Sequence, residues 1–191
     1  ITPTVEGKDA KVEVEVYTTE LKDGQKIAYT LYDKEENELQ KIVSTDKVVT
    51  FEIKDVHLWH GRKDPYLYCC EAEIVEGDEV IDNVCSRFGV RSFKIDPDNG
   101  FILNGKEYPL RGVSRHQDRW GIGNALLPEH HKEDAELIYE VGANTIRLAH
   151  YQHDQYFYDL CDEMGFVIWA EIPYISSHMP AGRENTISQM K

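Results

Sequence analysis

Basic side chains are scarce in this 191-residue sequence, which has 21 lysines and arginines against 35 aspartates and glutamates and a formal net charge of −14. A surface that binds nucleic-acid phosphates or anionic lipid headgroups needs a basic patch. No apolar run approaches the roughly 18 residues that a membrane-spanning helix requires. We therefore expect neither nucleic acid nor a membrane among the partners.

The sequence also lacks a leader that we can recognise. It begins Ile1-Thr2-Pro3 without a methionine, and no signal peptide opens it. From this start, and from the way the chain stops at Lys191, we expect a piece of a longer protein. The acidic charge fits a cytoplasmic and a periplasmic protein equally well, so it assigns no compartment.

Cysteine is rare, with four residues and no Cys-x-x-Cys spacing, so a zinc site is not expected. Cys69 and Cys70 are neighbours on a predicted strand and point to opposite faces, and one of them could face Cys85 across a hairpin. So few cysteines are not a disulfide framework. We therefore favour buried free thiols over a disulfide.

The first half of the chain shows many short segments in which apolar and polar residues alternate, the period of a half-buried strand. Gly77-Asp78 between two of them is typical of a hairpin turn. Five to seven such strands without a helical period favour an antiparallel β-sandwich. The expected strands are residues 12–17, Lys26–Asp33, Leu39–Ser44, Lys47–Lys54, Tyr66–Val75 and Glu79–Arg91.

A cluster of helix- and strand-breaking residues at 96–100 separates this pattern from a different one, so we place a domain boundary there, with domains at 1–95 and 96–191. A hairpin is expected at Phe101–Tyr108. Beyond it, strands and helices alternate, which predicts a parallel sheet with right-handed crossovers. The expected order is strand Pro109–Ser114, helix Lys132–Val141, strand Thr145–Ala149, helix Asp154–Met164 and strand Phe166–Glu171.

Polar and ionisable residues follow each of these three strands. In such architectures the site lies at the carboxyl ends of the strands, so these side chains should line one pocket. Carboxylates, histidine and arginine surrounded by aromatic residues suit a ligand rich in hydroxyl groups. The residues at the three ends are Arg115, His116, Gln117 and Asp118; Arg147, His150 and Tyr151; and Trp169, Glu171 and Tyr174.

Other roles remain open for some of these residues. Arg147 lies inside its strand and can equally serve as a buttress paired to Glu171. Trp59 in the first half is expected to be a core or domain-interface anchor. The remaining histidines of the second half are expected at the surface (His130, His131) or without a role (His153, His178).

Several motifs together resemble glycoside hydrolase family 2, the group of β-galactosidases, β-glucuronidases and β-mannosidases. The resemblance covers nearly the whole chain and implies an immunoglobulin-like β-sandwich followed by a partial (β/α)8 barrel with its first three strands and two helices. Its β-galactosidase branch is the most similar. The motifs are Phe101-Ile-Leu-Asn-Gly-Lys, Leu110-Arg-Gly-Val-Ser-Arg-His-Gln-Asp, Gly142-Ala-Asn-Thr-Ile-Arg-Leu-Ala-His-Tyr, Leu160-Cys-Asp-Glu-Met-Gly and Trp169-Ala-Glu-Ile-Pro-Tyr.

The resemblance implies a role for five residues in binding a β-galactoside. His116 and His150 match histidines that line the sugar subsite and stabilise the transition state. Asp118 matches a carboxylate near the sugar hydroxyls. Arg147 matches an arginine that orients the catalytic carboxylates, and Glu171 matches the glutamate that ends the third strand.

The resemblance also implies residues that this sequence does not contain. The family's acid/base is a glutamate preceded by asparagine, and the only Asn-Glu here is Asn37-Glu38, inside the predicted sandwich. The nucleophile lies later still. We therefore expect no catalytic residue in this chain and no hydrolysis by it alone. Magnesium ligands of some relatives match Ile175 and Ser177, which are poor ligands, so no cofactor is expected.

Two other interpretations stay open. A β-glucuronidase or β-mannosidase would share the motifs, and a non-catalytic carbohydrate-binding or interaction module would share the fold. An open third strand exposes unpaired backbone groups and apolar surface. We therefore also expect the chain to self-associate through the partial barrel.

Overall fold

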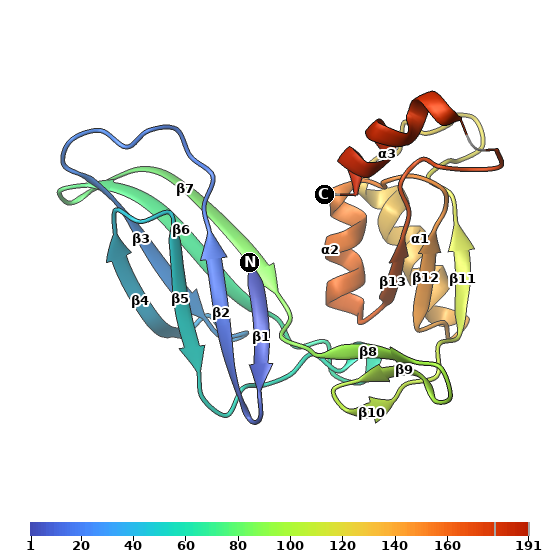
Figure 1. Ribbon diagram of the computed structural model, residues 1–191, viewed down its shortest axis with the longest axis horizontal. Helices are drawn as coiled ribbons and strands as arrows, with labels where there is room; N and C mark the ends of the chain where they lie inside the picture. Colours follow the sequence, from blue (N-terminus) through green and yellow to red (C-terminus); the bar gives the residue numbers. More distant parts are fainter. Residues whose placement is uncertain (178, 191) are drawn as a thin grey trace. The chain divides into compact units, whose positions relative to one another are not determined.

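The computed structural model describes residues 1–177 and 179–190. The chain forms two compact units, one made of Ile1–His60 with Asp64–Tyr108, and the other of Gly61–Lys63 with the residues from Pro109 onward (Figure 1). The division after Tyr108 differs from the boundary expected near residue 96. The reason is the sheet of β8 (Phe93–Asp96), β9 (Gly100–Leu103) and β10 (Lys106–Glu107), which belongs to the first unit.

Asn104 ties that small sheet to the first unit. Its backbone N–H donates to the carbonyl of Ser92 at 2.8 Å. Its side-chain amide donates to the carbonyl of Trp59 at 2.9 Å. The hairpin expected at Phe101–Tyr108 is present, and its turn between β9 and β10 is Asn104-Gly105, in which both residues have positive φ. The strand β8, in contrast, was not predicted.

The first unit is the expected antiparallel sandwich. Its two sheets have the strand orders β1-β2-β5 and β4-β3-β6-β7, and every neighbouring pair is antiparallel. The strand β1 escaped prediction because it is a half-exposed edge strand that contains Pro3, and such a strand shows no clear apolar alternation. The strands are β1 (Thr2–Glu6), β2 (Asp9–Glu15), β3 (Gln25–Tyr32), β4 (Glu38–Ser44), β5 (Val48–Ile53), β6 (Tyr68–Glu76) and β7 (Glu79–Phe88).

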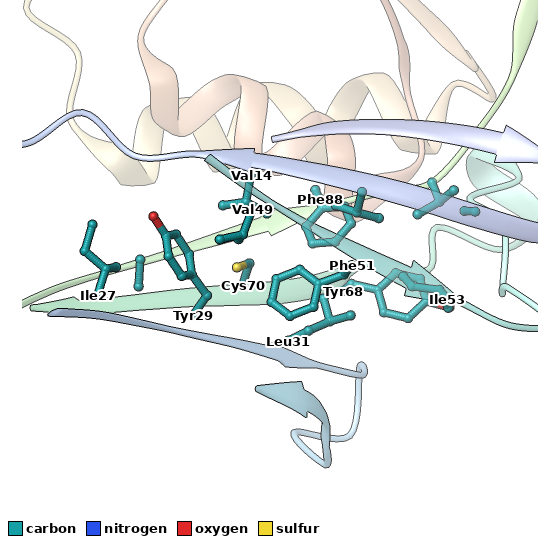
Figure 2. Close-up of a cluster of buried hydrophobic side chains, with 14 residues drawn as sticks. Val14, Ile27, Tyr29, Leu31, Val49, Phe51, Ile53, Tyr68, Cys70 and Phe88 are labelled. Atoms are coloured by element: carbon teal, nitrogen blue, oxygen red, sulfur yellow. The ribbon is translucent and has the colours of Figure 1, made fainter. Parts of the chain in front are cut away.

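The core of the sandwich lies between these two sheets (Figure 2). Every second residue of β2 and of β5 is buried, which is the alternation that the sequence predicted. Tyr29 and Phe51 are fully buried, and the Tyr29 hydroxyl donates to the carbonyl of Asp46 at 2.8 Å, so burial leaves no polar atom of this side chain without a partner. Trp59 is buried, as expected.

The cysteines correct one expectation. Cys69 and Cys85 form a disulfide between β6 and β7, with their Cα atoms 6.7 Å apart. The pairing Cys69↔Arg87 places Cys85 two residues along, on the same face and diagonally across the hairpin. The prediction of buried free thiols was correct for Cys70 and Cys161. Burial raises the pKa of the Cys70 thiol to about 11.

The second unit is the start of a (β/α)8 arrangement, which confirms the predicted fold class. Its sheet has the order β11-β12-β13, and both pairs of strands are parallel. Two of its helices were predicted, whereas α3 was not. The elements are β11 (Gly112–Arg115), α1 (Pro128–Glu140), β12 (Thr145–Leu148), α2 (Gln155–Met164), β13 (Val167–Ala170) and α3 (Arg183–Gln189), with short 3-10 turns at Gly61–Lys63 and Pro180–Gly182.

The C-terminal ends of α1 and α2 fall within one residue of the predicted ends, whereas α1 begins at Pro128, four residues before the expected Lys132. Asp154 caps α2 by accepting a hydrogen bond from the N–H of Tyr156 at 2.9 Å. Gly142 follows α1 with a φ of 87°, and Gly165 ends α2 with a φ of 78°, a conformation that favours glycine. None of the helices among the described residues combines the length and the apolar character needed to cross a membrane.

The helices α1 and α2 pack on one face of the parallel sheet (Figure 1). Ile146 and Leu148 of β12 point into this layer and meet Ala135 of α1 and Phe157 of α2. Because side chains alternate along a strand, Arg147 points to the opposite face. That opposite face is open: Arg147 is exposed, and Trp169 beside it in the register is 66% exposed.

Candidate active site

The three parallel strands bring their carboxyl ends to the same edge of the sheet. Ser114 of β11 pairs with Arg147 of β12, and Arg147 pairs with Trp169 of β13, so these residues share one face. The residues that follow the strands therefore lie next to one another, although more than 20 positions separate them in the sequence. This edge is where barrel enzymes carry their sites.

Arg147 and Glu171 form the centre of this edge. The Arg147 Nε lies 2.5 Å from Glu171 Oε1, and the Arg147 Nη2 lies 3.2 Å from Glu171 Oε2. Two parallel N–H···O contacts fix the plane of the guanidinium as well as its position. The hydrogen bond from Arg147 lowers the pKa of the Glu171 carboxyl below its usual range, and a further hydrogen bond from His150 adds to this effect.

His150 joins this pair from the end of β12. Its Nδ1 lies 3.1 Å from Glu171 Oε2 and 3.1 Å from Arg147 Nη2. Arginine is only a donor, so Nδ1 accepts from Arg147 when it carries no proton and donates to Glu171 when it does. The peptide bond between Ala149 and His150 is cis.

His116 and Tyr151 extend the group toward β11. The His116 ring meets the His150 ring edge-on, with the ring centroids 5.1 Å apart, and lies 6.2 Å from the ring of Tyr151. The Tyr151 hydroxyl accepts a hydrogen bond from the backbone N–H of Gln117 at 3.2 Å. The structure thus brings together four of the five predicted binding residues: His116, Arg147, His150 and Glu171.

Asp118 stands apart from them. Its side chain is exposed and makes no hydrogen bond or ion pair with any residue in the described parts of the chain. The next residues form a tight turn in which Arg119 and Gly123 pair as an isolated bridge. At its tip Trp120 is 99% exposed, an aromatic that the sequence did not single out. Of the aromatics predicted at the edge, Trp169 and Tyr174 are exposed.

Arg115 was predicted to line the pocket, and this was wrong. The strand β11 extends one residue further than expected, and by strand alternation Arg115 points to the helix-covered face, where it is 5% exposed. There it forms an ion pair with Asp134, with Nε and Nη2 at 2.9 and 2.8 Å from Oδ2. Its guanidinium also lies over the ring of Phe157 at 3.8 Å.

Two histidines surround the same guanidinium. His131 was expected at the surface, but it is 2% exposed, and its Nδ1 lies 3.1 Å from Arg115 Nη2. His153 was expected to have no role. It is 7% exposed, its Nδ1 lies 3.1 Å from Arg115 Nη1, and its Nε2 lies 3.1 Å from the carbonyl oxygen of Ala149. His178 lies outside the described residues.

Burial, followed by the nearby Arg115 charge, lowers the pKa of His131 below the ordinary histidine value. For His153, burial is again the main cause of a lowered pKa. A metal ion is usually held by three or more histidine, cysteine or acidic side chains. In residues 1–177 and 179–190 no such group is arranged so that it could hold one.

A sandwich followed by parallel strands whose carboxyl ends gather an arginine, a glutamate and two histidines is the arrangement of a multidomain protein with the start of a (β/α)8 barrel. The family model described as "Glycosyl hydrolases family 2" matches residues 1–91. The model described as "Glycosyl hydrolases family 2, TIM barrel domain" matches residues 94–190. The chain therefore belongs to glycosyl hydrolase family 2, as its motifs predicted.

Individual relatives fall into two substrate groups by name. A β-glucuronidase of Bacteroides fragilis is 50% identical over 123 residues, which is 64% of this chain and 18% of that protein. A β-galactosidase of Thermoanaerobacter pseudethanolicus is 31% identical over 179 residues, covering 91% of this chain and 22% of that protein. This chain thus spans about a fifth of the length of these relatives.

Among solved structures, the chain is similar to an FMN-binding β-glucuronidase from Facaelibacterium prausnitzii L2-6. The TM-score is 0.88 and the identity 43%, over 92% of this chain and 28% of that chain. A structure described as a putative β-galactosidase from Bacteroides fragilis gives a TM-score of 0.82 at 39% identity, over 92% of this chain and 28% of that chain. The similar solved structures, like the similar sequences, include proteins named β-glucuronidase and proteins named β-galactosidase.

Proposed function

We propose that the full-length polypeptide carrying this chain is a retaining exo-glycosidase, which releases a terminal non-reducing β-linked sugar. The observation that carries the proposal is the contact of Glu171 with both Arg147 and His150 at the strand ends of a family 2 chain. Charged groups that hold one another in place before the substrate arrives can stabilise developing charge without reorganising.

Each residue of the group has a role in this proposal. His116 and His150 form one wall of the sugar subsite, where their imidazoles hydrogen-bond sugar hydroxyls. The contact with Glu171 occupies Nε and Nη2 of Arg147, and Nη1 then serves as a donor to one of the catalytic carboxylates. Glu171 keeps the guanidinium plane fixed, and the exposed Asp118 reaches a sugar hydroxyl from the rim.

Retaining hydrolysis needs two further carboxyl groups about 5–5.5 Å apart. One protonates the glycosidic oxygen as the bond to the leaving group breaks, and the other attacks the anomeric carbon. Water then hydrolyses the glycosyl-enzyme ester. Asp118 and Glu171 follow β11 and β13, which have β12 between them, so they are not this pair. We infer that both catalytic carboxylates lie outside this chain, which alone is inactive.

Two substrates fit this proposal. The motifs favour a β-galactoside, since they most resemble the β-galactosidase branch. The names of the 50% identical sequence and of the 43% identical structure favour a β-glucuronide. Glucuronic acid differs from galactose in carrying a carboxylate at C6 and in having an equatorial instead of an axial hydroxyl at C4, so the choice depends on charge at C6 and on configuration at C4.

Hydrolysis of two chromogenic substrates tests the proposal. The full-length polypeptide is assayed with p-nitrophenyl β-D-glucuronide and with p-nitrophenyl β-D-galactoside, and the anomer released is followed by proton NMR. Release of a β-anomer from one of them supports retention, and the higher kcat/KM names the sugar. Hydrolysis of neither substrate, or release of the α-anomer, would contradict the proposal.

The isolated chain gives a second test. It should hydrolyse neither substrate, because the two catalytic carboxylates are missing. Turnover by the 191-residue chain that Glu171→Gln abolishes would overturn the inference that those carboxylates lie elsewhere. Tight binding of galactose or glucuronate to the isolated chain would instead support a binding module, because one wall of a subsite should hold a sugar only weakly.

A further inference from the structure

A chain of buried hydrogen bonds connects the helix layer of the second unit to the turn that carries His150. It starts at Asp134 on α1, passes through the guanidinium of Arg115 at the end of β11, and continues through the ring of His153 to the carbonyl oxygen of Ala149. Arg115 and His153 are both buried. Neither side chain belongs to the Arg147–Glu171 group, yet the contacts of His153 reach both neighbours of His150: the carbonyl oxygen of Ala149 and the ring of Tyr151, whose centroid lies 5.3 Å from that of His153.

The hydrogen-bonding chemistry of arginine fixes the state of His153. A guanidinium carries only donors, so the Nδ1 of His153, at 3.1 Å from Arg115 Nη1, must be the acceptor. The ring is therefore neutral and has its proton on Nε2. That N–H then donates to the carbonyl of Ala149 at 3.1 Å. The lowered pKa of His153 agrees with a neutral ring in this position.

The backbone of Arg115 also forms a hydrogen bond with Ala149. The N–H of Ala149 donates to the carbonyl of Arg115 at 3.0 Å. Both backbone polar groups of Ala149 are thus fixed by β11 and His153. On the other side of the turn, the side-chain oxygen of Gln117 accepts from the N–H of Asp154 at 2.6 Å. The turn from Ala149 to Asp154 is clamped at both of its ends.

We propose that Arg115 and His153 are positioning residues for the active site, which act through Ala149 to hold His150 and Tyr151 in their places against Glu171 and Gln117. The inference deepens the proposed function, because it assumes that His150 takes part in binding the sugar. Its structural half, that His153 sets the position of the His150 ring, is independent of any activity.

His131 offers a matched control on the same guanidinium. Its Nδ1 also lies 3.1 Å from an Arg115 nitrogen, its ring is also buried, and its pKa is also lowered by burial. Its contacts include Tyr156 and Phe157 of α2, and no contact with Ala149 is among them in the described part of the chain. A substitution at His131 therefore removes one acceptor from the buried arginine, as one at His153 does, but it leaves the hydrogen bond from His153 to the carbonyl of Ala149 in place.

The experiment compares His153→Phe with His131→Phe, two substitutions that keep an aromatic ring and remove the acceptor for Arg115. Histidine-labelled NMR spectra of the chain report the ring signals of His150. Kinetics on the full-length polypeptide report kcat and KM, and chemical unfolding reports stability. We expect both variants to lose stability. Only His153→Phe should shift the His150 signals and lower kcat by about 10- to 100-fold, the range for a displaced catalytic contact.

Several outcomes would overturn the inference. It fails if His153→Phe leaves the His150 signals as they are in the parent, or if His131→Phe shifts them equally. Should His153→Phe not fold, His153→Gln is compared instead, since its amide nitrogen can still donate to Ala149, and it should keep the His150 signals of the parent. If the full-length parent hydrolyses neither glycoside, the proposed function fails, whereas the NMR comparison still decides the position of His150.

Discussion

Arg147 and Glu171 meet through two contacts, Nε to Oε1 at 2.5 Å and Nη2 to Oε2 at 3.2 Å, across neighbouring parallel strands. The register explains the meeting, because Arg147 pairs with Trp169, and Glu171 follows two residues later at the end of the same strand. His150 contacts both partners, so three side chains from two strand ends form one hydrogen-bonded group.

We expect Arg147→Lys to damage this group although it keeps the charge. A lysine ammonium is a point donor and cannot make two parallel contacts with one carboxylate. The pKa of Glu171 should rise from its lowered value toward the ordinary range, measured by carbon-13 NMR of its carboxylate. In the full-length polypeptide, kcat should fall on the order of 10- to 100-fold.

The matched control for this substitution is Arg119→Lys. Arg119, in the loop that follows β11, also forms an ion pair with a glutamate of the same unit, Glu133 of α1. It should leave the titration of Glu171 and kcat as they are in the parent. Equal effects of the two substitutions would mean that the Arg147–Glu171 contact has no special place in the site.

The stability of the chain should fall as the pH is lowered from about 7.5 to 5.5. The pKa values of His131 and His153 are lowered in the folded state, so the unfolded chain, with an ordinary histidine pKa near ~6.5, takes up protons first. The stabilisation is complete above the unfolded pKa and is lost as the pH falls toward the folded values. Urea unfolding at a series of pH values measures it.

The double variant His131→Phe with His153→Phe isolates the cause of this slope. It should have a flatter dependence of the urea midpoint on pH across that interval, because the two buried groups that resist protonation are gone. A parent midpoint that stays constant between these pH values would contradict the prediction. So would a double variant with the same slope as the parent.

The sequence predicted the elements that have a clear period and the contacts that follow from them. The strands around Arg147 and Glu171 are short and apolar and follow directly on Gly142 and Gly165, so their pattern alone places their ends at one edge of a parallel sheet. The Arg147–Glu171 pair itself was predicted as one of two roles for Arg147. The same patterns predicted an antiparallel sandwich followed by a parallel sheet, whereas the (β/α)8 barrel was implied by the family resemblance.

The buried group around Arg115 was not predictable in this way. Whether Arg115 faces the pocket or the helices depends on where β11 ends, because shifting a strand end by one residue changes which face the next side chain meets. His131 lies near the start of α1, among charged residues that indicate an exposed turn. The disulfide between Cys69 and Cys85 depends in the same way on the register of β6 and β7.

Gly165 should tolerate alanine less well than Gly142 does. Both have a positive φ, 78° and 87°, so each substitution costs roughly 1–2 kcal/mol of stability for the left-handed backbone. At Gly165 the added Cβ would also clash with the backbone of Gly61 and Arg62, whereas nothing lies within 4 Å at Gly142. Urea unfolding should therefore show a larger loss for Gly165→Ala, and equal losses would argue against the close approach.

We also propose that the isolated chain self-associates through the open face of its parallel sheet. Parallel sheets are normally covered on both faces, but here one face packs on α1 and α2, and the other carries Trp169 at 66% exposure beside exposed Arg147. Along its outer edge, β13 has no neighbouring strand among residues 1–177 and 179–190, so backbone donors and acceptors there can bind a second copy. Sedimentation equilibrium at increasing concentration should show dimers or larger species, and Trp169→Lys should weaken them.

Trp120→Lys serves as the control, because Trp120 is more exposed, at 99%, but lies on a loop instead of on the sheet. A monomer at every concentration, or an equal effect of both substitutions, would mean that the open sheet face is not the surface of association.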